Sequence, residues 1–311
     1  MKQVMRVMKP GLFTTVQDLG RPNAISAGVP PGGAMDRFAH RAANLMAGND
    51  EGAATLECTL SGPGLIALEP CLVAITGADF DPQVNDEPVQ MWTSIFLSEG
   101  DELSFAGRRS GARAYIAVAG GIEGDRWLGS LSTYMLAARG GMHGRLLKAG
   151  DEIGIAGQPS APAISGRQLA HALRPRYSDH TLHAIAGPHI KRLGAEGRKT
   201  LFGSPFSVSR DADRMGYRLE GPVLDASGDE LLSFGLTAGA IQVPRSGQPI
   251  LLMADHQTAG GYPVVATVAS AAMPVAAQLL PGDEVTFAEV SIEAALRMRA
   301  AHRAALELLR S

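Results

Sequence analysis

The sequence is poor in cysteine and carries no familiar metal-ligand pattern. Only two of its 311 residues are cysteines, Cys58 and Cys71, and each lies in an apolar, strand-like segment. This favours reduced, buried thiols over a disulfide framework or a cysteine-based zinc site. The eight histidines lack the His-Glu-x-x-His spacing and other familiar ligand patterns. We therefore predict no metal site in this chain.

The chain also lacks an excess of charge and a long apolar run. Its 28 basic and 31 acidic residues give a net charge of −3, which argues against binding to nucleic acid or to an acidic membrane surface. No apolar run reaches the roughly 20 residues that a membrane-spanning helix needs. The start, "MKQVMRVMKPG", has no apolar stretch of secretory length. We expect a soluble, cytoplasmic protein.

Glycine and proline, by contrast, are abundant, with 37 and 19 residues. They separate short segments rich in valine, isoleucine and aromatic residues, a pattern typical of strands joined by tight turns. The predicted strands are 65–68, 71–76, 94–97, 102–105, 112–119, 152–155, 240–243, 250–253, 264–269 and 284–287. This spacing predicts a mainly β protein of the sandwich or barrel type, without βαβ units.

Helical periodicity appears at two places, residues 35–47 and 291–310. The segment 156–168 is rich in glycine, proline, serine and alanine, so it is the best linker candidate. We predict two barrel-like lobes, 1–160 and 170–290, with the helix of 291–311 packed outside. A Gly-Asp-Glu motif recurs in "EGDELSF", "AGDEIGI" and "PGDEVTF", and a shared turn type explains it better than a duplication.

Five segments hold more polar residues than a turn requires: 14–22, 29–37, 128–134, 209–221 and 251–268. The glycine pair of 29–37 fits an anion site at a helix start, although a plain turn into a capped helix is favoured. The hydroxyls of 128–134 suit ligand donors and ordinary turns equally well. In 209–221, Arg214 and Arg218 suit a carboxylate, unless they form surface pairs with acids such as Asp213.

The segment "DHQTAGGYP" offers the strongest candidate site. Asp255 is a possible base, His256 is titratable, and Gln257 and Thr258 are neutral hydrogen-bonding groups. Gly260 and Gly261 let the backbone approach a ligand. Tyr262 and Gln242 complete the candidate set. An Asx turn followed by a bulge is the structural alternative. The sequence contains no Gly-x-Ser-x-Gly motif, and neither cysteine has a histidine nearby in the sequence. No catalytic nucleophile is therefore indicated.

Together these segments resemble a known family. "GLFTTVQDLGRP", "GVPPGGAMDRFAHRAANLMAGN", "LGSLSTY", "DRMGYRLEGP" and "GAIQVPRSGQPILLMADHQTAGGYPVVATV" are similar to the allophanate hydrolase subunit 2 family. That family includes the C subunit of the prokaryotic 5-oxoprolinase and the biotin-dependent carboxyltransferase domain of urea carboxylase. The resemblance runs in order over about residues 4–290 and implies a cyclophilin-like β-barrel.

The resemblance also implies function and partners. It implies an ATP-dependent 5-oxoprolinase that cleaves a small lactam, in which this chain is inactive without 5-oxoprolinase subunits A and B. The site would use Asp255 or Asp213 as base, with Arg214, Arg218, Gln242 and Gln257 binding the substrate. A urea or amide carboxyltransferase is the alternative, with biotin on another chain, because no biotinyl-lysine segment occurs here.

A third possibility, of a different class, is a non-catalytic regulatory binding protein. The family usually has arginine where this chain has Leu131 in "GSLST" and His256 in "DHQT". Both differences remove a fixed cation, which favours this possibility and raises the question of whether the substrate is that of the best-known members.

Overall fold

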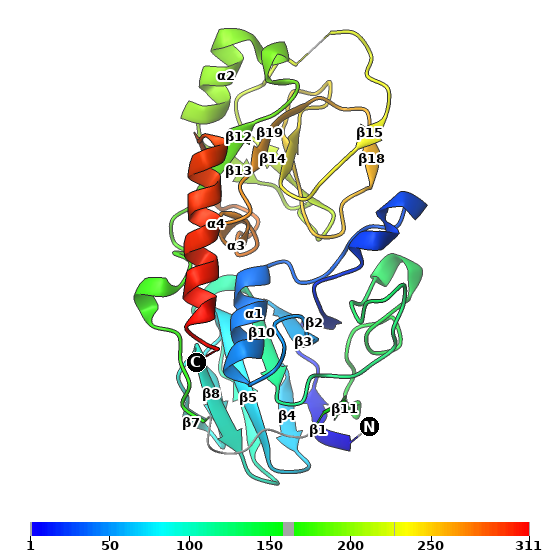
Figure 1. Cartoon of the computed structure of the whole chain (residues 1–311), viewed down its shortest axis with the longest axis vertical. Coiled ribbons are helices and arrows are strands. Elements are labelled where there is room, and N and C mark those ends of the chain that lie inside the picture. The colour runs from blue at the N-terminus through cyan, green and yellow to red at the C-terminus, as the bar shows by residue number, and fades with distance from the viewer. Residues whose placement is uncertain (1, 158–164, 227, 311) are drawn as a thin grey trace. The chain divides into compact units, whose positions relative to one another are not determined.

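The computed structural model describes residues 2–157, 165–226 and 228–310, and the chain divides into two compact units (Figure 1). Unit 1 takes Met1–Arg21, Gly32–Arg174 and Ala304–Ser311, and unit 2 takes Pro22–Pro31 and Pro175–Arg303. Each unit is therefore assembled from separate stretches of the sequence. Within the predicted linker, residues 158–164 lie outside the described residues.

Unit 1 is built on two antiparallel sheets. The six-stranded sheet has the order β11-β1-β4-β9-β6-β7, and the five-stranded sheet has the order β2-β3-β10-β5-β8. The strands are β1 Lys2–Lys9, β2 Phe13–Gln17, β3 Thr55–Thr59, β4 Gly64–Ala67, β5 Cys71–Asp79, β6 Pro82–Val84, β7 Glu87–Pro88, β8 Thr93–Leu97, β9 Glu102–Phe105, β10 Ser110–Val118 and β11 Glu152–Ile155.

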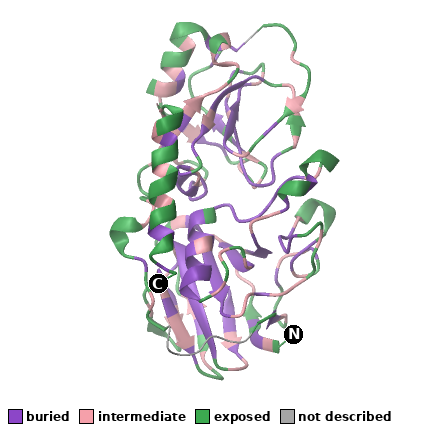
Figure 2. Cartoon of the chain, viewed as in Figure 1, coloured by how far each residue is buried: buried purple, intermediate pink, exposed green. Residues whose placement is uncertain are grey.

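Side-chain alternation along β10 explains the layers of unit 1. Ala114 and Ile116 belong to an apolar core with residues from both sheets. Tyr115 points the other way, and its hydroxyl accepts the backbone N–H of Asp36 at 2.7 Å, where α1 (Arg37–Met46) begins. Helix α1 therefore covers the second face of the five-stranded sheet, and Figure 2 shows most of it buried.

Unit 2 contains a closed seven-stranded barrel of order β12-β19-β16-β17-β14-β13-β20. All neighbouring strands are antiparallel except β12 and β20, which are parallel. A ribbon of β15 and β18 accompanies it. The strands are β12 Thr181–Ala186, β13 Phe206–Val208, β14 Gly216–Glu220, β15 Phe234–Gly235, β16 Ala240–Gln242, β17 Ile250–Leu252, β18 Ala259–Gly260, β19 Val264–Val268 and β20 Glu284–Glu289.

The remaining elements are short helices and α4. The α-helices besides α1 are α2 Gly194–Gly203, α3 Met273–Ala276 and α4 Ile292–Glu307, and the 3-10 turns are η1 Pro22–Ala27, η2 Met135–Ala137, η4 His171–Leu173 and η5 Ile190–Leu193. The predicted mainly β fold is confirmed, and the two predicted helices correspond to α1 and α4. Helix α2 was not predicted, because it buries only Leu201 and so has no apolar stripe.

Candidate functional site

The two polar segments of unit 2 meet through an ion pair. Arg214 Nε donates to Oδ2 of Asp255 at 2.9 Å, and Arg214 Nη2 donates to Oδ1 at 3.2 Å. Only 12% of the arginine side chain and 10% of the aspartate side chain are exposed. One guanidinium thus occupies two of the roughly four acceptor sites of this carboxylate and fixes its orientation. The pair therefore joins the segment of 209–221 to the segment of 251–268.

Asp213 and Arg218 do not join this pair. Asp213 is exposed, and its Oδ1 accepts the backbone N–H groups of Met215 at 2.7 Å and Gly216 at 3.1 Å. Arg218 is exposed on β14, because it alternates with buried Tyr217. Asp213 thus shapes a turn, and Arg218 points away from the barrel interior, so neither lies beside the Arg214–Asp255 pair.

The amide side chains of the candidate set do converge. Gln242 is 1% exposed, and its Nε2 has no hydrogen-bond partner among the described residues. A Cβ added at Gly260 would lie 3.3 Å from this Nε2 and 2.7 Å from Nε2 of Gln257. Two side-chain amides thus lie close to one glycine backbone, and each can both donate and accept a hydrogen bond. An unpaired buried donor is costly unless a ligand or water satisfies it.

A cleft of about 870 Å³ is lined by the residues that directly follow Gly260 in the chain. Gly261 and Tyr262 line one part of it, and Val243, which follows Gln242, lines another. The charged residues that line it are Arg192, Arg245, Asp225, Asp229 and Glu230. Its volume is in the range typical of small-molecule sites.

His256 and Thr258 serve the local backbone. His256 is buried, and its Nδ1 lies 2.7 Å from the carbonyl oxygen of Gln257, so this nitrogen is the donor. The carbonyl oxygen of Thr258 accepts the N–H of Leu236 at 2.9 Å, beside the β15–β18 ribbon.

Sequence reasoning missed His189. Its Nδ1 accepts the backbone N–H of Val264 at 3.1 Å, so in the neutral ring Nε2 carries the proton. The ring lies 5.1 Å from that of Phe234, on β15 beside Gly260. His189 therefore offers a fixed N–H donor near the amide pair. The only signal in the sequence was a histidine directly after the Gly-Pro turn that ends β12.

In unit 1, the polar segments 14–22 and 128–134 form one clasp around Asp18. Its carboxylate accepts the hydroxyls of Ser130 and Ser132, both at 2.6 Å, and the backbone N–H groups of Leu131 and Gly20, both at 2.7 Å. Arg21 is buried, donates to the carbonyl oxygen of Ser132, and lies 5.0 Å from the Trp127 ring centroid. These hydroxyls are thus used internally, which decides between the two interpretations that the sequence left open.

Leu131 lies within this clasp, but its side chain has another role. It is 5% exposed and belongs to the apolar core of unit 1. Segment 29–37 is likewise structural in its second half, since Asp36 caps α1 by accepting the N–H of Ala39 at 2.9 Å.

Across the ranges 2–157, 165–226 and 228–310, no helix has the length and apolar character needed to cross a bilayer.

The structure matches K. lactis urea amidolyase with a TM-score of 0.92 at 28% identity, over 99% of this chain and 20% of that chain. The chain belongs to the family described as carboxyltransferase domain, subdomain A and B, whose model matches residues 27–289.

Two curated relatives match over almost their whole length. The chain is 38% identical over 299 residues to the 5-oxoprolinase C subunit of Escherichia coli, covering 95% of this chain and 94% of that protein. It is 33% identical to the 5-oxoprolinase C subunit of Haemophilus influenzae, again over 95% and 94%. The family resemblance found in the sequence is therefore confirmed.

Proposed function

We propose that the chain is the C subunit of an ATP-dependent 5-oxoprolinase, which opens 5-oxoproline to glutamate together with subunits A and B. The observation that carries the proposal is the 38% identity to the Escherichia coli protein across nearly all of both chains. The chain contributes substrate binding and is inactive alone, while ATP is used by the complex in the cytoplasm.

The amide pair suits the chemistry of this reaction. Opening a lactam adds water to the carbonyl carbon and breaks the C–N bond, so negative charge develops on the carbonyl oxygen. Donors held in a dry site stabilise that charge. Of the two amides only Gln242 is buried, and it has an unused N–H; Gln257 is exposed and approaches the same glycine, so a bound substrate or partner would have to exclude water from it. We assign these two amides to the lactam N–C=O group, with the Nε2–H of His189 as a further donor.

The charged end of the substrate needs a different partner from the one that the sequence suggested. Arg214 is engaged by Asp255, and Arg218 faces outward. Arg192 and Arg245 line the cleft that Gly261 and Tyr262 also line, so we assign the substrate carboxylate to them. The Arg214–Asp255 pair then holds the turn that presents Gln257.

A carboxyltransferase-like component is the second candidate, favoured by the TM-score of 0.92 to a urea amidolyase. It would act on a urea or amide with carboxybiotin carried by another chain. Since both reactions act on an N–C=O group, the same amide pair serves either. The regulatory alternative loses one supporting feature, because Leu131 is a core residue rather than a truncated ligand contact.

Co-expression with the cognate subunits A and B tests the proposal. We expect ATP-dependent release of glutamate from 5-oxoproline by the complex of all three proteins, and none by this chain alone. Equal turnover by subunits A and B without this chain would refute the catalytic role. Carboxylation of urea with carboxybiotin, without glutamate release, would establish the second candidate instead.

A further inference from the structure

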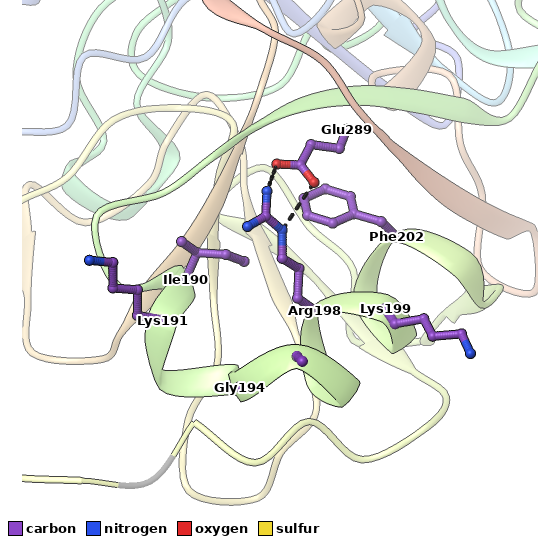
Figure 3. Close-up of a pocket in the computed structure, with 8 residues that line it drawn as sticks. Ile190, Lys191, Gly194, Arg198, Lys199, Phe202 and Glu289 are labelled. Atoms are coloured by element: carbon purple, nitrogen blue, oxygen red, sulfur yellow. Dashed lines mark hydrogen bonds and ion pairs between the residues drawn. The ribbon is translucent and has the colours of Figure 1, made fainter.

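A hollow of about 560 Å³ lies beside α2 in unit 2 and is drawn in Figure 3. It shares no residue with the cleft of the candidate site. Its lining combines apolar and charged side chains: Ile190, Lys191, Gly194, Ala195, Arg198, Lys199, Phe202 and Glu289. Protein interfaces likewise combine apolar with charged side chains.

The cations of this hollow are not equivalent. Arg198 is engaged, because its Nε donates to Oε2 of Glu289 at 3.1 Å and its Nη2 to Oε1. Lys191 and Lys199 are exposed, and neither side chain forms an ion pair or hydrogen bond with the described residues. Figure 3 shows the two lysines extending to opposite sides of the Arg198–Glu289 pair.

This region is positively charged, whereas the whole chain carries a net negative charge. The net charge of the protein is −3, yet the segment "HIKRLGAEGRK", 189–199, has four lysines and arginines and one glutamate. Helix α2 buries only Leu201. The basic residues therefore do not serve the packing of the barrel, and two of them remain available to a partner.

We propose that this hollow docks an acidic segment of a partner polypeptide. An apolar side chain of that segment contacts Ile190 and Phe202, while its carboxylates face Lys191 and Lys199. Complementary charge of this kind speeds association and makes binding sensitive to salt. The proposal rests on the proposed function, in which the chain works within a complex, and it identifies where a partner binds.

The test is the binding of this chain to the subunit 1 family protein encoded by the same genome, with Kd and the association rate measured by surface plasmon resonance at low and high salt. For the double variant Lys191→Glu/Lys199→Glu we expect Kd to rise by about tenfold or more, chiefly through slower association. Ala195→Trp fills the exposed hollow without changing charge, and we expect a similar rise. The matched control Arg297→Glu/Arg299→Glu reverses two exposed charges on α4 and should leave Kd within about twofold.

The outcomes separate this inference from the proposed function. If the wild-type chain binds its partner and both hollow variants bind equally well, the docking site is elsewhere, and the proposed function stands. If ATP binds the isolated chain and the lysine variant abolishes that binding, the hollow is a small-anion site and the inference is wrong. A complex that forms as expected but releases no glutamate contradicts the proposed function alone. No complex with the wild-type chain contradicts both.

Discussion

Gln242 and His40 are both fully buried polar side chains, but they differ in what surrounds them. His40 Nδ1 lies 2.9 Å from the hydroxyl of Thr55, and Nε2 lies 3.4 Å from Nδ2 of Asn44. Because the Thr55 hydroxyl also donates to the Gln17 carbonyl, the His40 ring donates from Nδ1 and accepts at Nε2. His40 is thus satisfied by the fold, whereas Gln242 keeps an N–H that a ligand or a water can use.

The first prediction follows from that unused N–H. Gln242→Met keeps the length of the side chain and removes a buried donor, whose desolvation costs about 1–3 kcal/mol. We expect the variant to be as stable as the wild type or more stable by about 1 kcal/mol, while the assembled complex loses at least about tenfold in activity. Urea denaturation and glutamate release measure the two effects.

Gln248→Met is the matched control. Gln248 accepts the N–H of Gly221 at 2.9 Å and donates to its carbonyl oxygen at 3.2 Å, so its loss should reduce stability by about 1 kcal/mol and spare activity. Full activity of Gln242→Met would remove Gln242 from the site.

The second prediction concerns acid stability. Burial, the largest cause, lowers the pKa of His40 to about 3; the charge of Asp18 opposes this shift, and smaller effects of Arg41 and Arg37 add to it. The unfolded pKa is about 6.5, so below that pH protons bind the unfolded chain more readily. This contribution to stability is complete above pH 6.5 and is lost as pH falls from about 6.5 towards 3, by about 1.4 kcal/mol per pH unit.

His40→Gln should flatten the dependence of the free energy of unfolding on pH in that window by about one proton. The exposed His171 supplies the control variant His171→Gln, which should leave the slope unchanged. An unaltered slope in His40→Gln would show that this histidine does not contribute.

At the scale of elements, the sequence predicted the local structure, namely strands and turns, but not the contacts between residues that are far apart in the chain. The three Gly-Asp-Glu motifs form the same turn: Asp101, Asp151 and Asp283 each accept, at 2.7 to 2.8 Å, the N–H of the residue three positions earlier. All ten predicted strands correspond to observed strands, because glycine and proline mark their ends. The Asp18 clasp joins residues more than a hundred positions apart, which no local periodicity reports.

The third prediction belongs to these turns. Gly282 has a φ of +93° with no atom within 4 Å of an added Cβ, so its backbone conformation alone demands glycine. Gly282→Ala should destabilise unit 2 by about 1–2 kcal/mol. Gly203 also has open space but no positive φ, so Gly203→Ala should cost nothing, and denaturant unfolding compares the two. Equal stability of both variants would contradict the strain argument.

At the scale of the whole molecule, the two units do not follow a single cut in the sequence. The predicted division gave residues 291–311 to one outer helix, whereas the contacts place Ala304–Ser311 with unit 1 and the residues before them with unit 2. Arg167 Nη1 donates at 3.1 Å to the carbonyl oxygens of both Leu45, in α1, and Leu309. Arg310 adds an ion pair to Glu51 at 3.3 Å. The periodicity of apolar residues could not predict these contacts, because it identifies the buried face of a helix but not the residues that pack against it.

The last prediction tests whether the end of the chain is part of unit 1. Leu309 is 3% exposed and its neighbour Leu308 is 61% exposed, so the two provide a matched pair with the same chemical change. Leu309→Ala leaves a cavity and should lower stability by about 2–5 kcal/mol, whereas Leu308→Ala should stay within about 0.5 kcal/mol of the wild type. Hydrogen exchange of the β5 and β10 amides locates the effect: faster exchange there in Leu309→Ala places the loss in unit 1. If the two variants unfold alike, the terminal residues contribute nothing to that unit, and its boundary lies earlier in the chain.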